Sequence, residues 1–245
     1  MGSVPVLLVE DRGPVRIVTM NRPQKRNALN SELSQCLLDT LVRTENDEVG
    51  CVVLTGAGQG FCAGADLSEF KELQDPQAAD ARAELTMQLH LIFTRMKTPV
   101  VSAINGAAMG GGAGLAIAAD MAVMAQSAKL GYPESRHGIV AAIVMANLVR
   151  QVGRKAAFEL VSLGEPIDAA KALALGMVNR VVPDAEVLPH SIALAEKLAC
   201  VARPAMAETK RLFHEVADLA LAPALERGRD TNRRMRNFQK LGAKT

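Results

Sequence analysis

The sequence is poor in aromatic side chains, because its 245 residues include no Trp, one Tyr and six Phe. Aromatic rings are the usual stacking platforms for single-stranded nucleic acids, so nucleic-acid binding is not expected. Signatures of metal sites and disulfides are also missing. The cysteines (Cys36, Cys51, Cys62 and Cys200) form no CxxC pair, and no two histidines stand at ligand spacing. We therefore expect reduced thiols, no metal site and a cytoplasmic protein.

Targeting and membrane segments are not evident either. The first residues, Met1-Gly2-Ser3-Val4-Pro5, lack the basic and then apolar pattern of a signal peptide. The longest uncharged run, residues 98–119, contains Asn105-Gly106 and the triple glycine 110–112. A turn and a triple glycine inside a bilayer would leave backbone polar groups without partners. We interpret this run as a buried strand, a glycine loop and a buried helix, and expect no membrane segment.

Hydrophobic residues make up 49% of the chain and charged residues 22%, which is typical of a globular protein with a sizeable core. The net charge of +2 is unevenly placed. Residues 226–245 hold seven basic and two acidic side chains, a charge of +5, which leaves −3 for the other 225 residues. Such a basic tail suits a phosphate-bearing ligand or an acidic surface, and the alternative is a solvated C-terminal helix.

Hydrophobic periodicity predicts an α/β core followed by helices alone. The expected strands lie at about residues 6–9, 15–20, 49–55, 100–104, 121–125 and 178–182, and the expected helices at about 31–43, 77–97, 111–118, 139–152, 154–163, 168–175 and from 189 onward, with breaks at Pro204 and Pro223. We divide the chain into a core, residues 1–188, and a C-terminal helical region, residues 189–245.

Three loops contain glycines that could matter for function. The loop at 56–58 follows a strand, but Phe61 stands where a dinucleotide-binding motif needs its third glycine, so a tight turn is expected. The loops at 61–67 and 106–115 consist of small residues, and the second opens a helix. Backbone N–H groups from two such loops, converging on one carbonyl oxygen, would form an oxyanion hole.

Several segments together carry a family resemblance. They are Asn21-Arg22-Pro23 with residues 27–30, residues 61–67, residues 99–106 leading into the triple glycine, residues 129–134, residues 164–170 and residues 175–179. In this order they resemble the enoyl-CoA hydratase/isomerase (crotonase) superfamily. The resemblance implies a spiral of ββα turns, C-terminal helices that build a trimer or hexamer, and stabilisation of a thioester enolate. Coenzyme A would then be part of the substrate, and no cofactor is expected.

The resemblance also implies site residues. The N–H groups of Ala65 and Gly111 would hold the thioester oxygen, and Glu134 would act as acid and base. The CoA thioester would be bound by Lys25, Arg26, Ala28, Ala63, Ala65, Asp66, Leu67, Ser68, Gly111, Gly114 and Tyr132. Phosphate contacts, across a subunit boundary, would come from the basic tail with Arg233, Arg234, Arg236 and Lys240.

One position departs from the family pattern. Glu134 lies in an apolar loop, which predicts a raised pKa. However, Gly114 occupies the position of the second hydratase glutamate. A glycine there would leave room for a larger acyl group or a water, and a glutamate restored at this position would be expected to complete the pair. Asp66 and Glu69 are the nearest candidates for a substitute, although Asp66 is also expected to anchor its own loop.

The main hypothesis is therefore an enoyl-CoA hydratase that uses an oxyanion hole and Glu134. A double-bond isomerase is the first alternative, because one carboxylate can move a proton from C2 to C4. An acyl-CoA-binding or RNA-binding protein with little catalysis is the second, since the basic tail could bind RNA phosphates.

Overall fold

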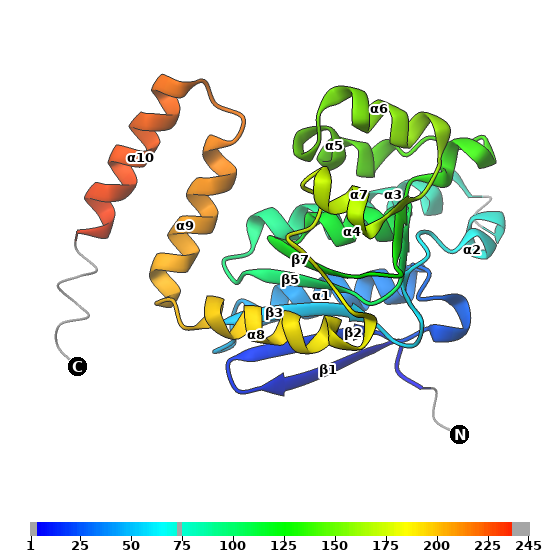
Figure 1. Ribbon diagram of the computed structural model, residues 1–245, viewed down its shortest axis with the longest axis horizontal. Coiled ribbons are helices and arrows are strands. Elements are labelled where there is room, and N and C mark those ends of the chain that lie inside the picture. The colour runs from blue at the N-terminus through cyan, green and yellow to red at the C-terminus, as the bar shows by residue number, and fades with distance from the viewer. Residues whose placement is uncertain (1–3, 73–74, 237–245) are drawn as a thin grey trace.

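The computed structural model describes residues 4–72 and 75–236, which form two β-sheets surrounded by helices (Figure 1). The large sheet has the order β1-β2-β3-β5-β7-β10, and the small sheet has the order β4-β6-β8-β9. The large sheet consists of β1 (Leu7–Arg12), β2 (Val15–Met20), β3 (Cys51–Gly56), β5 (Val100–Ile104), β7 (Met121–Ala125) and β10 (Arg180–Val182). The small sheet consists of β4 (Gly60–Cys62), β6 (Ala107–Met109), β8 (Lys129–Gly131) and β9 (Ile167–Asp168).

The helices follow the strands in a regular way. The α-helices are α1 (Ser31–Thr44), α2 (Leu67–Glu72), α3 (Pro76–Arg95), α4 (Gly111–Ala118), α5 (Ala142–Gln151), α6 (Arg154–Leu163), α7 (Ala169–Ala174), α8 (Val187–Ala199), α9 (Arg203–Val216) and α10 (Leu221–Met235). Short 3-10 helices are η1 (Pro23–Lys25), η2 (Pro133–His137) and η3 (Asp184–Glu186). Pro204 and Pro223 stand in the first turns of α9 and α10, where a missing N–H is tolerated.

Each turn of the chain adds one strand to each sheet and then a helix. The strand pairs β3–β4, β5–β6 and β7–β8 repeat this pattern, and β2, β3, β5 and β7 lie parallel in the large sheet. In the small sheet β4, β6 and β8 are also parallel. This is a spiral of ββα turns, so the predicted fold class is confirmed. Strands β4 and β6 lie in segments that were expected to be glycine-containing loops, and β9 lies where a helix was expected to start.

The uncharged run at 98–119 lies inside this spiral. It forms β5, β6 and α4, and all five residues of β5 are buried. Among the residues that the structure describes, no helix is both long enough and apolar enough to cross a membrane. The run therefore supplies the protein core and the start of α4.

The C-terminal helices fall into two groups. Helix α8 packs against β2, β3, β5 and β7, whereas α9 and α10 contact each other and stand to one side of the body (Figure 1). The expected boundary at residue 189 falls inside α8, and the division into two domains stays a prediction.

A partly buried ion pair connects α9 to the large sheet. The Lys210 ammonium lies 2.7 Å from the Asp120 carboxylate and donates to the Thr98 carbonyl at 3.1 Å. The Val100 N–H donates to the same Asp120 oxygen at 2.7 Å, and His214 Nε2 lies 3.7 Å from its other oxygen. Burial opposes ionisation of Asp120, but His214 and Lys210 outweigh it, so the pKa of this carboxyl lies below its ordinary value.

Replacing Lys210 with methionine is expected to lower the free energy of unfolding by about 2 kcal/mol, because Asp120 keeps a partly buried charge without its main partner. Since the folded pKa of Asp120 is lowered, its contribution to stability is full above the ordinary aspartate pKa and is lost as the pH falls toward the folded pKa. Urea denaturation at several pH values measures both effects. The exposed Lys197→Met is the control, and equal midpoints for the two variants would contradict the prediction.

Candidate active site

Two backbone N–H groups meet at the start of α4. Gly64 has a φ of +90°, and a Cβ built on it would lie 2.7 Å from the Met109 carbonyl oxygen and 3.4 Å from the Gly111 nitrogen. A Cβ on Gly111 would in turn lie 3.9 Å from the Ala65 nitrogen. Within the described residues, neither the Ala65 nor the Gly111 N–H has an acceptor. The N–H groups of Ala65 and Gly111, which were expected to act together, are therefore adjacent, and the absence of a side chain at Gly64 lets the two segments approach.

The loop that carries Ala65 is held by a short parallel bridge. The Leu29 N–H donates to Gly64 O at 2.7 Å, and the Asp66 N–H donates back to Leu29 O at 3.0 Å. These bonds use the polar groups on either side of Ala65 and leave its own N–H without an acceptor among the described residues. The loop is therefore rigid at the donor itself.

Glu134 lies against the same helix start. Gly110 has a φ of +52°, and a Cβ built there would meet Glu134 Oε1 at 2.8 Å. Glu134 Oε2 is buried and has no hydrogen-bond partner among the described residues. Burial raises the pKa of Glu134, while its own backbone N–H and the nearby His137 partly oppose this. The predicted rise in pKa is confirmed, and it makes the carboxylate a better proton acceptor near neutral pH.

Tyr132 is buried close to Glu134. Its side chain is 0% exposed, and its hydroxyl has no hydrogen-bond partner in the described part of the chain. Burial raises the pKa of Tyr132, and the charge of Glu134 adds to the rise. Tyr132 therefore contacts the site from inside the core, and its role in binding a substrate stays a prediction.

The turn after β2 and the loop after β4 lie side by side. Arg26 and Asn27 adopt left-handed conformations, and the Asn27 side chain donates to Ala57 O and Gly60 O at 2.9 and 2.8 Å. The Ala63 N–H donates to Arg26 O at 2.9 Å. The structure thus brings together the two segments that were expected to line a CoA channel. Lys25, Arg26, Ala63, Leu67 and Ser68 are exposed there, whereas Ala28 is buried.

Asp66 holds this arrangement in place. It accepts hydrogen bonds from Ser68, and its carboxylate pairs with Arg22 at 2.8 Å. These Ser68 bonds, together with Arg22, hold the pKa of Asp66 below its ordinary value in spite of partial burial. Arg22 also donates to Ala28 O, so one guanidinium connects both segments. The expectation that Asp66 anchors its own loop is confirmed.

Glu69, the other candidate for a second carboxylate, is also engaged. It accepts the Ser31 N–H at 2.9 Å, at the first turn of α1, and pairs with Arg82 at 3.2 Å. Arg82 in turn donates to Leu29 O at 2.8 Å. Glu69 is therefore a structural clamp between α1 and α3, and neither it nor Asp66 is available to replace the missing glutamate.

The space beside Gly114 is filled, which corrects the sequence-based expectation of room for an acyl group or a water. A Cβ at this position would lie 2.4 Å from Val144 Cγ1 and 2.7 Å from His90 Nε2. Real Cβ atoms essentially never show contacts this short, so a side chain requires its neighbours to move. A glutamate restored at 114 was expected to complete the pair only if the pocket accommodates its side chain, and this condition is not met unless Val144 and His90 move.

Replacing Gly114 with alanine is expected to lower the free energy of unfolding by about 1 to 3 kcal/mol, because its Cβ overpacks the space shared by Val144 and His90. Gly228→Ala in α10 is the matched control. A Cβ there meets nothing within 4 Å, so this change should raise stability by about 0.5 to 1 kcal/mol. Urea denaturation compares the two, and a Gly114→Ala variant as stable as Gly228→Ala would refute the overlap.

Sequence reasoning missed His90 as a site residue. Its Nε2 is buried at Gly114 and has no hydrogen-bond partner among the described residues. The available signal was its place on the apolar stripe of α3, one residue after Leu89 and three before Phe93. A polar side chain on a buried stripe needs partners, and only the Nδ1 of His90 finds one nearby in sequence, at the Thr86 carbonyl oxygen.

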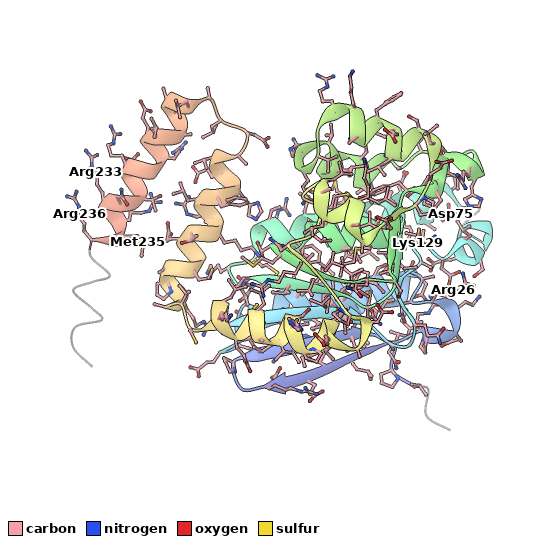
Figure 2. The ribbon with its side chains drawn as sticks, in the orientation of Figure 1. Arg26, Asp75, Lys129, Arg233, Met235 and Arg236 are labelled. Atoms are coloured by element: carbon pink, nitrogen blue, oxygen red, sulfur yellow. The ribbon has the colours of Figure 1, made fainter. Side chains whose placement is uncertain are left out.

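The basic tail lies far from the loops just described. Arg233 and Arg236 lie at the end of α10, at the opposite end of the molecule from Arg26 (Figure 2). Arg233 pairs with Asp230 at 3.6 Å, and Arg234 pairs with Glu208 at 3.3 Å. Lys240 lies outside the described residues. Within one chain Arg233, Arg234 and Arg236 do not reach the site.

Comparison with known proteins places the chain in one family. The family model described as enoyl-CoA hydratase/isomerase matches residues 10–243. A Thermus thermophilus protein with a provisional enoyl-CoA hydratase name is 42% identical over 86% of this chain and 85% of its own. The crystal structure of an enoyl-CoA hydratase from Mycobacterium smegmatis has a TM-score of 0.91 and 31% identity, covering 95% of this chain and 91% of its own. A Polaromonas enoyl-CoA hydratase structure has a TM-score of 0.89 and 30% identity, covering 94% and 91%. The chain therefore belongs to the enoyl-CoA hydratase/isomerase family.

Proposed function

We propose that this protein adds water to 2-enoyl-CoA thioesters through an enolate held in the oxyanion hole. The observation that carries the proposal is the meeting of three groups at the start of α4: the Ala65 N–H, the Gly111 N–H and the Glu134 carboxylate. Solved structures of similar fold are named enoyl-CoA hydratases, which supports the same assignment.

The proposed mechanism depends on the negative charge that develops on the thioester oxygen. Attack of water at C3 of an enoyl thioester moves electrons onto the thioester oxygen. Donors fixed at that oxygen stabilise the charge, each by about 3 to 4 kcal/mol, and the N-terminus of α4 adds a favourable dipole. Glu134 takes the proton that the water loses and returns a proton to C2. These groups complete the reaction by themselves, so we propose no cofactor, with coenzyme A present only as part of the substrate.

The exposed cations in the turn that follows β2 are complementary to the negative charge of coenzyme A. Lys25 and Arg26 stand next to the loop that carries Ala63 and Ala65, and they have no acidic partner among the described residues. A negatively charged phosphate group is attracted to such a surface. We propose that this side of the oxyanion hole receives the CoA moiety. The free thiols are consistent with a cytoplasmic location.

We further propose assembly into a trimer or hexamer through α9 and α10. Phe213, Leu221 and Leu225 on these helices are 67%, 74% and 64% exposed, which is unfavourable for a lone chain. A second chain is also what would bring the basic tail near a CoA phosphate, since both lie far apart in one chain (Figure 2). Light scattering at micromolar concentration should give three or six times the chain mass, and a monomer would contradict the assembly.

The test of the activity is a panel of purified thioesters with product identification. Crotonyl-CoA should be converted to 3-hydroxybutyryl-CoA. A 3-enoyl-CoA should be turned over only slowly, and faster conversion of it to the 2-enoyl product would identify an isomerase instead. Binding of these thioesters without turnover, together with salt-dependent RNA binding, would contradict both enzymatic assignments.

A further inference from the structure

The tautomer of His90 is fixed by α3. Its Nδ1 lies 2.8 Å from the carbonyl oxygen of Thr86, one helical turn earlier. Because a carbonyl oxygen only accepts hydrogen bonds, Nδ1 carries the proton. Burial lowers the pKa of His90 below its ordinary value, while the backbone of Thr86 and Gly111 partly opposes this. The ring is therefore neutral, and Nε2 has a free lone pair.

This lone pair lies at the first turn of α4. Nε2 is 2.7 Å from the point where a side chain at position 114 would begin, and it neighbours the backbone of Gly111. It is buried without a hydrogen-bond partner in the part of the chain that the structure describes. The His90 side chain, which comes from α3, thus occupies space that a side chain at position 114 of α4 would otherwise fill. A buried acceptor without a partner is unfavourable for folding and calls for a function.

A second acceptor without a partner, Glu134 Oε2, lies against the same turn of α4. The Gly114 N–H donates to Gly110 O at 2.9 Å, and Glu134 lies against Gly110 in the way that His90 lies against Gly114. Glu134 Oε2 is also buried without a partner among the described residues. Two acceptors therefore flank the turn that carries the Gly111 N–H. Val144 Cγ1 lies 2.4 Å from the position that a Cβ built on Gly114 would take, so a substrate that reaches His90 has to move the Val144 side chain.

We propose that His90 Nε2 is the second hydrogen-bond acceptor for the water that adds to the double bond, in place of the carboxylate missing at position 114. This inference rests on the proposed hydration. Once the Val144 side chain has moved, the water donates one hydrogen bond to Glu134 and the other to His90, which aims its oxygen at C3.

The proton and electron balance needs no change of charge on His90. The water oxygen forms a bond to C3, its O–H bond toward Glu134 breaks, and Glu134 takes that proton. The electron pair of the C2=C3 bond moves to the thioester oxygen between the Ala65 and Gly111 N–H groups. C2 then takes the proton from Glu134 and the thioester carbonyl is restored. The O–H bond that faces His90 remains as the product hydroxyl, so one carboxylate is sufficient.

The experiment compares water addition with proton exchange in the same variants. Crotonyl-CoA hydration needs the water to be aimed, whereas exchange of the C2 protons of butyryl-CoA with deuterated solvent needs only the oxyanion hole and Glu134. His90→Phe and His90→Leu remove the acceptor, and His90→Gln offers an amide oxygen. His190→Gln and His190→Phe are matched controls, because His190 Nδ1 also contacts the carbonyl oxygen one turn earlier, at 3.0 Å, on the exposed face of α8.

We expect hydration kcat to fall about 100-fold in His90→Phe and His90→Leu with KM and C2 exchange close to wild type. His90→Gln should recover at least part of the lost rate, and both His190 variants should behave as wild type. Hydration at the wild-type rate in either folded apolar variant, or an equal fall in hydration and exchange, would overturn the role of His90 alone. Wild-type protein that exchanges C2 protons but hydrates no enoyl-CoA would instead overturn the proposed function, and this inference with it. Circular dichroism identifies a variant that has not folded, and the other apolar variant then decides.

Discussion

Replacing Glu134 with glutamine should lower crotonyl-CoA hydration by about a thousandfold or more and leave thioester binding close to wild type. Glutamine keeps the shape of the side chain against Gly110 but cannot accept or return a proton. Steady-state kinetics measures the rate, and titration with butyryl-CoA measures binding.

The control for this variant is Glu159→Gln, an exposed glutamate on α6, which should leave the rate unchanged. Full activity in Glu134→Gln would show that another group carries the proton. Loss of butyryl-CoA binding in parallel with the rate would show that Glu134 acts in binding rather than in catalysis.

The same carboxylate sets the acidic side of the pH profile. Because burial raises the pKa of Glu134, the form that accepts a proton from water is lost at a higher pH than for an ordinary glutamate. Hydration by the wild type should therefore fall as the pH drops through this raised pKa and be constant above it. The residual rate of Glu134→Gln should lack this limb, and an identical limb in both proteins would assign it to another group.

Replacing Gly111 with proline should lower turnover by about a hundredfold to a thousandfold, because it deletes one oxyanion donor. The helix start should survive, since Gly111 is the first residue of α4 and proline is well accepted at that position. The Gly110 that precedes it is not in the α region, which a following proline disfavours.

Gly153→Pro is the matched control for a proline placed at a helix start. Gly153 precedes α6 with a φ of −60°, which proline adopts, and a Cβ there meets nothing within 4 Å. Its kinetics should equal those of the wild type. A folded Gly111→Pro variant with normal turnover would remove the Gly111 N–H from the oxyanion hole.

The sequence was sufficient for the parts of this molecule that depend on periodicity and caps. Strand β2 alternates, α1 has an Asn30 cap whose side chain accepts from Leu33 N at 3.0 Å, and Asp168 caps α7 in the same way. Each of these signals is local, because a few neighbouring residues decide it.

The small sheet could not be predicted, since its strands are two or three residues long and built from glycine, alanine and single larger residues such as Phe61. Such segments have neither alternation nor β-propensity, and only pairing between turns of the spiral makes them strands. The crowding at Gly114 was missed for a similar reason. Val144 and His90 come from helices 30 and 24 residues away, and only their packing fills the space.

The use of main-chain donors in the oxyanion hole has an evolutionary consequence. Apart from proline, no replacement at residue 65 deletes the Ala65 N–H, whereas the proposed proton carrier on η2 (Glu134) and the proposed water acceptor on α3 (His90) are side chains that one codon change can alter. In the proposed mechanism, enolate stabilisation is therefore less open to change by mutation than the subsequent fate of the enolate. Descendants of a protein with this backbone could change the reaction that they catalyse while their backbone N–H groups still bind the thioester oxygen.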